Sequence, residues 1–527
     1  MDIKVVKQIE RANQNNLRDS IKITIVLVFF IAVSLIAIVF GASANVLVLV
    51  FSAVIGAYMA MNIGANDVAN NVGPAVGSKA ITLLGAIGIA AIFEALGAIV
   101  AGADVVDTIK SGIIAPESVQ DSKVFICVML GALLSSALWL HLATFIGAPV
   151  STTHSLVGGV LGGGIVAGGF SVVNWAELGR IASSWIISPV MGGVIAVLFL
   201  VLIKNTITYK ENRQAAAKLV VPLLIFFMSF AFVLYMLMKG LKQILPISFS
   251  LALVVSLVIA LIVYFIARPL VSKRVQTLTN TKEDIGTLFT IPLIFAAAML
   301  SFAHGANDVS NAIGPLAAIN QALDSLGGES FGSRAGVPLW VLFIGGLGIS
   351  IGLALYGPRL IRTVGNEITE LDKIRAFCVA MSAAITVLLA SQLGLPVSST
   401  HVTIGAIFGV GFLREYLKKR YYEMQQTIID AHRGKDSVEV ERFLTNFNKA
   451  SMKQKGAILK SLKNNKSQYA LSFSKKEKKN LKKAYKNELV KRSAINKIIA
   501  SWLITVPISA VLGGIACYIA ISIDFVI

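Results

Sequence analysis

The chain has 527 residues, of which 56% are hydrophobic and only 14% are charged. A soluble domain has roughly 25% charged residues, so this composition excludes an ordinary soluble enzyme or nucleic-acid-binding domain and indicates a polytopic membrane protein. The net charge of +19 is concentrated in one segment. Residues 414–497 hold 23 Lys or Arg and 8 Asp or Glu, which amounts to +15 of the total.

Apolar runs predict the membrane spans, since a helix needs about 20 apolar residues to cross a bilayer. In chain order the runs lie at 23–40, 46–61, 81–100, 124–146, 156–170, 181–203, 219–238, 247–267, 288–302, 337–356, 376–393, 402–413 and 498–523. They predict twelve or thirteen passes. Several runs are too short to cross as straight helices, and the short ones lie beside two repeated polar motifs.

Each half of the chain contains the same ordered pair of motifs. "GANDVANNVGP" (64–74) returns as "GANDVSNAIGP" (305–315), with eight identities at an offset of 241. "PVSTTH" (149–154) returns as "PVSSTH" (396–401) at an offset of 247. A recurring pair of motifs indicates two structural repeats, and polar residues repeated among apolar runs indicate a functional site.

The basic loops orient the repeats. Loops 204–218 and 268–282 are separated by two spans, so they lie on one side, which the positive-inside rule makes the cytoplasm. By this count the N-terminus is inside, the C-terminus is outside, and the second repeat begins on the opposite side from the first. We therefore expect an all-α polytopic membrane protein with about 12 transmembrane helices in two inverted-topology repeats, with broken helices or re-entrant hairpins at the midplane.

The predicted organisation has six parts. They are an N-terminal segment with the first span (1–44), repeat A (45–180), linking spans with basic loops (181–287), repeat B (288–413), a basic cytoplasmic insertion (414–497) and the last span (498–527). We expect this chain in the cell (cytoplasmic or inner) membrane.

The motif side chains suggest ligands of both signs. Carboxylate, amide and hydroxyl oxygens suit alkali and alkaline-earth cations, and the expected sodium ligands are Asn66, Asp67, Asn70, Asn307, Asp308, Asn311, Ser151, Ser398 and Glu94. The Pro-Val-Ser elements resemble helix starts, whose free N–H groups bind phosphate-like anions. The expected anion-binding residues are Asp67, Ser151, Thr152, Thr153, Asp308, Ser398, Ser399 and Thr400.

The charges of such a site predict coupling. Two facing helix N-termini supply roughly +1 together, which is less than two aspartates and a phosphate-like anion carry. Only Lys79, at the margin, adds a Lys or Arg to the motifs. Because uncompensated charge is prohibitive in a low-dielectric interior, two or three Na⁺ ions would have to bind with the anion.

Four residues near the motifs carry further expectations. His154 and His401 are placed beside the site, either relaying protons to the anion or pinning each hairpin by bonding a backbone carbonyl, which we favour. His304 has Ile63 as its counterpart and is expected outside the symmetric site. Glu94 lies within a span and has no equivalent carboxylate in 347–358, so a third cation site there would be asymmetric.

Two further expectations concern prolines and cysteines. Prolines in the four motif copies should break helices and expose unpaired backbone groups; they are Pro74, Pro149, Pro315 and Pro396. The three cysteines show no disulfide or metal spacing and are expected to be small core residues.

At the four motif copies the chain closely resembles the inorganic phosphate transporter (PiT) family of secondary carriers, with further support from "GPRLIRTVGNEITEL" (357–371). The resemblance covers most of the chain except the first forty residues and the basic insertion. It implies phosphate uptake coupled to Na⁺, or in some bacterial members to protons or as a metal–phosphate complex. It also implies an inverted-repeat fold in which the motif residues bind phosphate and cations. Lys79 and the missing second glutamate depart from the family pattern.

The expected function is therefore a Na⁺/phosphate symporter that imports phosphate by alternating access, with the two halves rocking about the site, and not an enzyme. Its partners would be inorganic phosphate, Na⁺ as the only metal and the lipid bilayer, with no nucleic acid, no cofactor beyond the co-transported ion, and a homodimer left open. The alternative is a proton- or metal-phosphate-coupled permease, or one for arsenate or sulfate. An intramembrane aspartyl protease, which would use two aspartates, is a remote alternative, and a channel is a third.

Overall fold

The computed structural model describes residues 3–41, 45–114, 119, 121–148, 150–240, 247–326, 336–358, 360–361, 371–431 and 492–526. Within them, every regular element is a helix apart from one isolated bridge between Ile114 and Val173. The α-helices are α1 (Ile3–Phe40), α2 (Val46–Asn66), α3 (Val68–Gly77), α4 (Leu83–Ala101), α5 (Ala103–Asp107), α6 (Ser122–Ile146), α7 (Thr152–Gly168), α8 (Trp175–Ile203), α9 (Arg213–Tyr235), α10 (Phe249–Gln276), α11 (Lys282–Gly286), α12 (Thr290–Asp308), α13 (Ser310–Leu326), α14 (Leu339–Tyr356), α16 (Lys373–Gln392), α17 (Ser399–Ala431) and α21 (Arg492–Ser522). Short π-helical or 3-10 turns η1 (Thr108–Gly112), η3 (Phe170–Val172), η4 (Lys204–Thr208), η5 (Met236–Gly240) and η6 (Thr287–Phe289) adjoin them.

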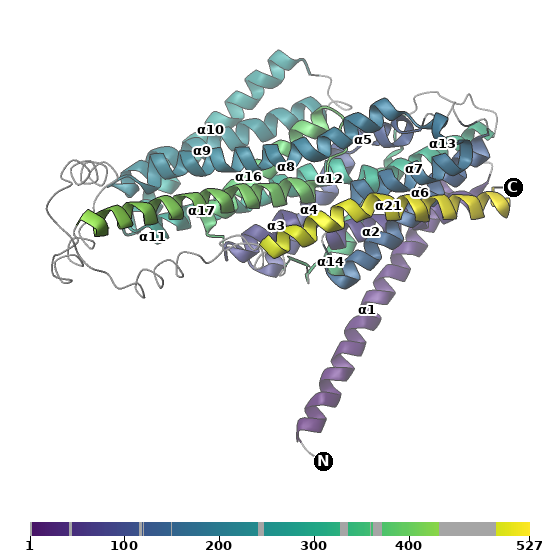
Figure 1. The fold of residues 1–527 in the computed structure, drawn as a ribbon, viewed down its shortest axis with the longest axis horizontal. Helices are drawn as coiled ribbons and strands as arrows, with labels where there is room; N and C mark the ends of the chain where they lie inside the picture. Colours follow the sequence, from purple (N-terminus) through teal and green to yellow (C-terminus); the bar gives the residue numbers. More distant parts are fainter. Residues whose placement is uncertain are drawn as a thin grey trace.

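The helices form an elongated bundle from which α1 departs obliquely (Figure 1). Eleven helical segments in the described ranges are long and apolar enough to cross a membrane, which confirms a multi-pass protein. The sequence predicted twelve or thirteen passes. The difference arises at the second motif, because α7 has only 17 residues and the C-terminal part of the 33-residue α17 is charged.

Both Asn-Asp motifs interrupt a long helix. Each of the segments 46–77 and 282–326 is one long apolar stretch. The first is interrupted at Asp67, between α2 and α3, and the second at Val309, between α12 and α13. The expectation that Pro74 and Pro315 break these helices was wrong, since both lie inside α3 and α13. Each proline instead follows the break by about two turns, where its missing N–H only removes a hydrogen bond to the carbonyl four residues earlier.

The two halves of the chain are interleaved. α2 of the first half packs along α14 of the second, and α12 of the second packs along α4 of the first. The same exchange occurs around the second motif, where α7 packs on α21 and α17 packs on α8. This reciprocal pairing is what two related repeats produce, and their inversion across the membrane stays a prediction.

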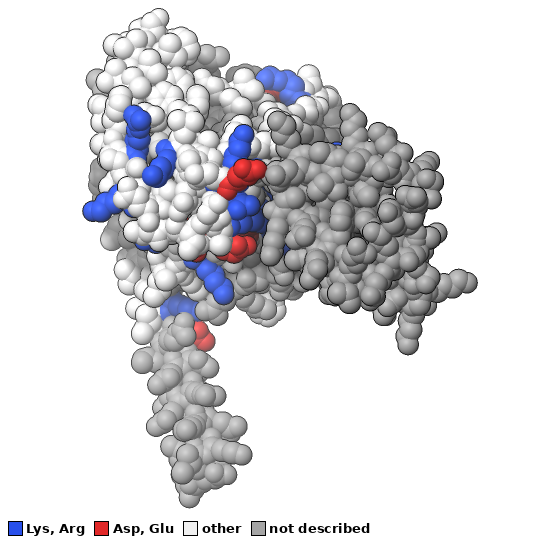
Figure 2. Space-filling model, turned by 90° about the vertical axis from the view of Figure 1, so that its left-hand side faces the viewer, with Lys and Arg blue, Asp and Glu red and all other residues white. Residues whose placement is uncertain are grey.

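The two basic loops meet at one end of the bundle, as expected of loops on one side of a membrane. Arg213 donates from its backbone N–H to Asn280 Oδ1 at 2.8 Å and from its guanidinium to the Asn280 carbonyl at 2.9 Å. Figure 2 shows Lys and Arg side chains gathered on this end, with few acidic ones between them. The predicted boundary at residue 414 falls within α17, and most of the basic insertion (432–491) lies outside the described residues.

Glycines allow the closest helix contacts. A Cβ on Gly162 of α7 would lie 1.8 Å from the carbonyl oxygen of Ala510 on α21, whereas a Cβ on Gly88 of α4 would meet nothing within 4 Å. Gly162→Ala must push α7 away from α21, and overpacking of this kind costs about 1–3 kcal/mol. We expect a lower thermal unfolding midpoint in detergent for Gly162→Ala. Gly88→Ala is the matched control and should leave the midpoint unchanged or raise it. Equal midpoints for the two variants would contradict the interlocked packing.

Candidate substrate site

The four motif copies converge at one buried place. Every motif residue that the sequence nominated for phosphate or sodium is at most 3% exposed, namely Asn66, Asp67, Asn70, Ser151, Thr152, Thr153, Asn307, Asp308, Asn311, Ser398, Ser399 and Thr400. Polar side chains gathered in an apolar bundle carry a desolvation cost that their mutual hydrogen bonds must offset. Those bonds show what each residue does.

Asn66 and Asn307 hold the loops that lead into the second motif. Asn66 Nδ2 donates to Thr144 Oγ1 at 3.0 Å and to the Ala148 carbonyl at 3.2 Å, and Asn66 Oδ1 accepts from the Val150 N–H at 3.3 Å. Asn307 repeats this pattern in the other half, where its partners are Ser391 Oγ (3.0 Å), the Leu395 carbonyl (3.1 Å) and the Val397 N–H (3.2 Å). These amides therefore position the hydroxyl-bearing helices.

Asn70 and Asn311 reach across to the opposite half. Asn70 Nδ2 donates to Thr400 Oγ1 at 2.8 Å, and Asn311 Nδ2 donates to Thr153 Oγ1 at 3.1 Å and to Thr152 Oγ1 at 3.2 Å. With their N–H groups used in this way, both amide oxygens point away from any donor. In the described part of the chain, Asn70 Oδ1 and Asn311 Oδ1 are buried without a hydrogen-bond partner. A pair of unpartnered carbonyl oxygens is suited to a small cation.

The two carboxylates accept hydrogen bonds from hydroxyls of the second motif. Thr400 Oγ1 donates to Asp67 Oδ1 at 3.1 Å, and Ser399 Oγ donates to Asp308 Oδ2 at 2.7 Å. Asp308 Oδ1 has no partner among the residues that the structure describes. Each carboxylate thus keeps capacity for a further ligand, because an ionised carboxylate offers about four acceptor positions.

Both Pro-Val-Ser elements end in a helix start, as predicted. The Ser151 hydroxyl accepts from the His154 N–H at 3.2 Å, and the Ser398 hydroxyl accepts from the His401 N–H at 3.3 Å. The other N–H groups of a first turn have no partner within the helix, and the helix dipole favours negative charge there. Two such turns lie beside two aspartates, so groups suited to an anion adjoin groups suited to cations.

His304 and Asn71 are site residues that sequence reasoning missed. His304 Nδ1 lies 2.6 Å from Glu94 Oε2, and His304 Nε2 lies 2.9 Å from Asp308 Oδ2. Asn71 Nδ2 donates to the other Glu94 oxygen at 2.8 Å. His304 was set aside because its counterpart is Ile63, but a histidine within a span was itself the signal.

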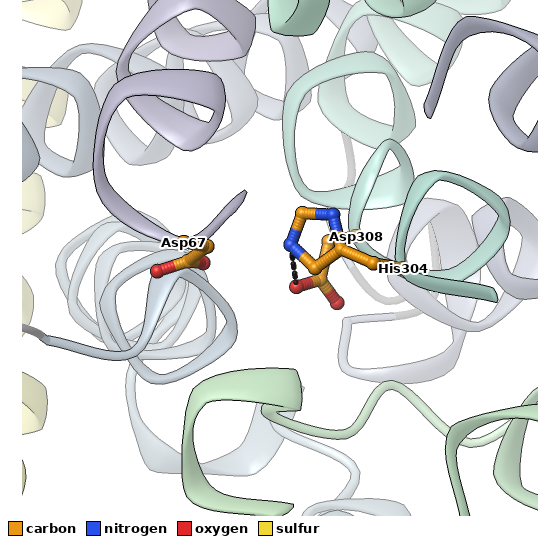
Figure 3. Close-up of side chains that lie close together, drawn as sticks. All are labelled: Asp67, His304 and Asp308. Atoms are coloured by element: carbon orange, nitrogen blue, oxygen red, sulfur yellow. Dashed lines mark ion pairs between the residues drawn. The ribbon is translucent and has the colours of Figure 1, made fainter. Parts of the chain in front are cut away.

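The imidazole comes close to both aspartates. Oxygen atoms of Asp67 and Asp308 and a nitrogen of His304 lie within 4.8 Å of one another (Figure 3). The three side chains come from the two broken helices, with Asp67 facing the pair formed by His304 and Asp308. Two carboxylates and one imidazole are a mixed oxygen and nitrogen set that is able to hold a cation.

His154 and His401 meet each other on the far side of the helix starts. Their ring centroids lie 4.4 Å apart edge to face, and each ring packs at a tilt against a tryptophan, with centroid distances of 3.9 Å for His154 and Trp185 and 3.5 Å for His401 and Trp502. Their ring nitrogens form no well-aligned hydrogen bond in the described ranges, although the backbones of Trp502 and Trp185 are near them. Ring packing therefore holds these histidines more than the expected backbone hydrogen bond.

The remaining candidates lie away from the site. Lys79 is an exposed residue with φ of 58° in the turn that ends α3, so it adds no charge to the site. The three cysteines are free and buried, as expected. Most of the "GPRLIRTVGNEITEL" segment (residues 359 and 362–370) lies outside the described residues, and so does Pro149.

Broken helices that bring carboxylates, unpartnered amide oxygens and helix N-termini together inside a membrane bundle are typical of transporters of small ions. The model of the phosphate transporter family matches residues 63–513. This chain belongs to that family. It is a phosphate transporter and not an enzyme, which removes the aspartyl protease alternative.

Known proteins of similar sequence and structure agree with this assignment. A protein named "Putative phosphate permease" from Helicobacter pylori strain J99 is 54% identical over 521 residues, which are 98% of each chain. A protein of the same description from Thermococcus kodakarensis is 40% identical over 69% of this chain and 89% of its own length. A solved structure described as "The sodium-dependent phosphate transporter" matches with a TM-score of 0.72 and 31% identity, covering 91% of this chain and all of its own.

The loop-holding role of Asn66 can be tested against a neighbouring amide. Asn66→Leu removes three hydrogen bonds worth about 1 kcal/mol each, so the phosphate concentration for half-maximal uptake should rise by about tenfold or more. Asn62 is one turn earlier on α2, and its amide donates only within that helix, to the Tyr58 carbonyl at 2.9 Å. Asn62→Leu is therefore the matched control and should keep near-normal uptake. Similar uptake curves for the two variants in proteoliposomes would contradict the role.

Proposed function

We propose that this protein is a sodium/phosphate symporter that imports phosphate by alternating access. One observation carries the proposal. A single buried place combines two carboxylates, two unpartnered amide oxygens and two hydroxyl-capped helix starts. Such a place offers ligands for small cations and for an anion within reach of one another.

Phosphate is proposed to bind between the N-terminal turns of α7 and α17. Those turns carry the six hydroxyls that the sequence nominated, which are Ser151, Thr152, Thr153, Ser398, Ser399 and Thr400. Asp67 and Asp308 already accept hydrogen bonds from hydroxyls of these turns. A protonated phosphate oxygen could donate to either carboxylate, whereas sulfate has no proton to donate, which disfavours sulfate.

Sodium is proposed to bind at Asp67 and Asp308 with the unpartnered oxygens of Asn70 and Asn311. Pro74 and Pro315 add to this, because a proline cannot donate to the carbonyl four residues earlier, and those carbonyls belong to the same two asparagines.

Other nominated sodium ligands are less available. Asn66 and Asn307 each use the side-chain oxygen to hold a loop, and Ser151 and Ser398 cap helices, so any sodium contact would use a remaining lone pair. Both oxygens of Glu94 are engaged, by Asn71 and His304. We therefore propose that Glu94 supports His304 in place of binding sodium.

The charge argument for coupling still holds when His304 is included in the site. Any positive charge on His304 is neutralised by Glu94, because His304 Nδ1 lies only 2.6 Å from Glu94 Oε2. The two aspartates and the anion are then left with only the partial charges of the helix N-termini. Entry of sodium with phosphate removes the excess negative charge, so neither binds well alone.

The interleaved helices suggest which parts move. The carboxylates and amides lie where α2 meets α3 and where α12 meets α13, with α2 packed on α14 and α12 packed on α4. The hydroxyls lie at the starts of α7 and α17, which pack on α21 and α8. Each of these two groups of helices contains members from both halves of the chain. We propose that these two groups move against each other, in place of the two repeats rocking as wholes.

A metal–phosphate or proton-coupled permease is the second candidate, favoured by the cluster of Asp67, His304 and Asp308. A set of ligands that contains a nitrogen atom suits a divalent metal ion better than it suits sodium. The solved relative is named for sodium dependence, which favours the first candidate. The cytoplasmic-membrane location, the cytoplasmic side of the basic end and a homodimer stay proposals.

Uptake of radiolabelled phosphate into proteoliposomes tests the coupling ion. A sodium gradient should drive uptake, and a potassium, proton or Mg²⁺ gradient alone should not. Asp67→Asn and Asp308→Asn each remove a charged ligand worth about 1.5–3 kcal/mol, so sodium-driven uptake should fall roughly ten- to a hundredfold. Asp19→Asn, on the exposed surface of α1, is the control and should transport normally. Uptake at full rate without sodium would exclude the symporter.

Variants that remove hydroxyl groups distinguish the proposed phosphate ligands from the proposed sodium ligands. Thr152→Val and Ser399→Ala each remove one neutral donor, worth about 1 kcal/mol, and should raise the phosphate concentration for half-maximal uptake by about fivefold. The sodium concentration for half-maximal uptake should change less. Ser155→Ala is the control, since the Ser155 hydroxyl bonds Ser509 on α21, at 2.9 Å. A larger shift for sodium than for phosphate would reverse the assignment.

A further inference from the structure

Backbone contacts align the two halves residue by residue around the site. A Cβ on Gly64 would lie 1.9 Å from the Ile349 carbonyl oxygen, and one on Gly305 would lie 2.2 Å from the Glu94 carbonyl oxygen. A second pair of contacts, one turn away, joins Gly352 to Met61 and Gly97 to Phe302. Because both pairs give the same register, Glu94 corresponds to Ile349 and His304 corresponds to Ile63.

The two sides of the site differ at one polar cluster. On one side, Asn71 and Glu94 of the first repeat and His304 of the second form a chain of polar contacts that ends on Asp308. The other side has Ala312, Ile349 and Ile63 at the matching positions, and none of these side chains can hydrogen-bond. Asp67 thus has no counterpart of this chain on its own side of the site.

This difference changes what a cation meets at each aspartate. Among the described residues, Asp67 is bonded by hydroxyls alone, those of Thr400 and Thr152, and each hydroxyl oxygen keeps a lone pair for a metal ion. Asp308 Oδ2 is shared by the Ser399 hydroxyl and by His304 Nε2, at 2.7 and 2.9 Å. With Glu94 against its Nδ1, the imidazole is held where it takes up one approach to Asp308 Oδ2 that a further oxygen ligand would otherwise use.

We infer that the two aspartates are unequal sodium sites, that Asp67 takes the first ion, and that His304 and Glu94 are positioning residues that set this order by occupying Asp308. The inference rests on the proposed sodium coupling and deepens it. Loss of the cluster should bring the two sites to similar affinity, because the two sides would then match at these three positions.

The test follows sodium binding through the thermal unfolding midpoint of the purified full-length carrier, without phosphate. The unfolding midpoint of the wild type should rise in two steps as sodium is added. The two steps should lie about tenfold or more apart in sodium concentration, because the two sites differ by one strong ligand. The variant N71A/E94I/H304I gives this side of the site the residues found on the other side, and its two steps should merge at the lower concentration. I63V/I349V, at the matching positions, is the control and should keep two steps.

Single variants assign the steps and guard against a triple variant that fails to fold. D67N should remove the step at low sodium and D308N the step at high sodium, and H304Q should move the high-sodium step down by about threefold or more. A single step in wild type, the reverse assignment, or unchanged steps in H304Q would overturn the inference while leaving sodium coupling intact. No stabilisation of wild type by sodium would instead refute the proposed coupling itself.

Discussion

Two carboxylates buried in an apolar bundle are the constraint on which this structure depends. Asp67 and Asp308 are both 1% exposed, and the interior cannot tolerate their charge without donors or cations close by. The second motif places hydroxyls and helix N-termini beside these carboxylates, and the flanking asparagines hold those elements in place. The features that lower the cost of burial are the same features that bind ions.

Neither half of the chain completes the site alone. Asn70 bonds Thr400 and Asn311 bonds Thr153, so each amide is ordered by a hydroxyl from the other half. The supporting helices are exchanged in the same way, and glycines bring their backbones into contact. Ion binding at one aspartate must therefore be felt by helices of both repeats, which gives a physical route from occupancy to movement.

The sequence predicted the class of protein, the repeats and the motif residues of the site, because these follow from composition and from identities at fixed spacing. It did not predict His304 or Asn71, since arguments from symmetry discard residues that occur in only one copy. The roles of Asn66 and Asn307 were also beyond reach, because an amide that holds a loop and an amide that binds sodium have the same letters. The expectation for the prolines was wrong for a physical reason, because a proline inside a helix can remove one hydrogen bond without ending the helix.

The asymmetric cluster has a consequence for the transport cycle if the repeats are inverted as proposed. In an inverted repeat, the inward-facing and outward-facing states are exchanged by the two-fold axis, so identical halves would give the two states equal energy. A residue difference between the halves is needed to make them unequal. Around this site that difference is concentrated at Asn71, Glu94 and His304, against Ala312, Ile349 and Ile63. The polar chain that ends on Asp308 is thus the part of the site able to make ion binding differ between the two faces of the membrane.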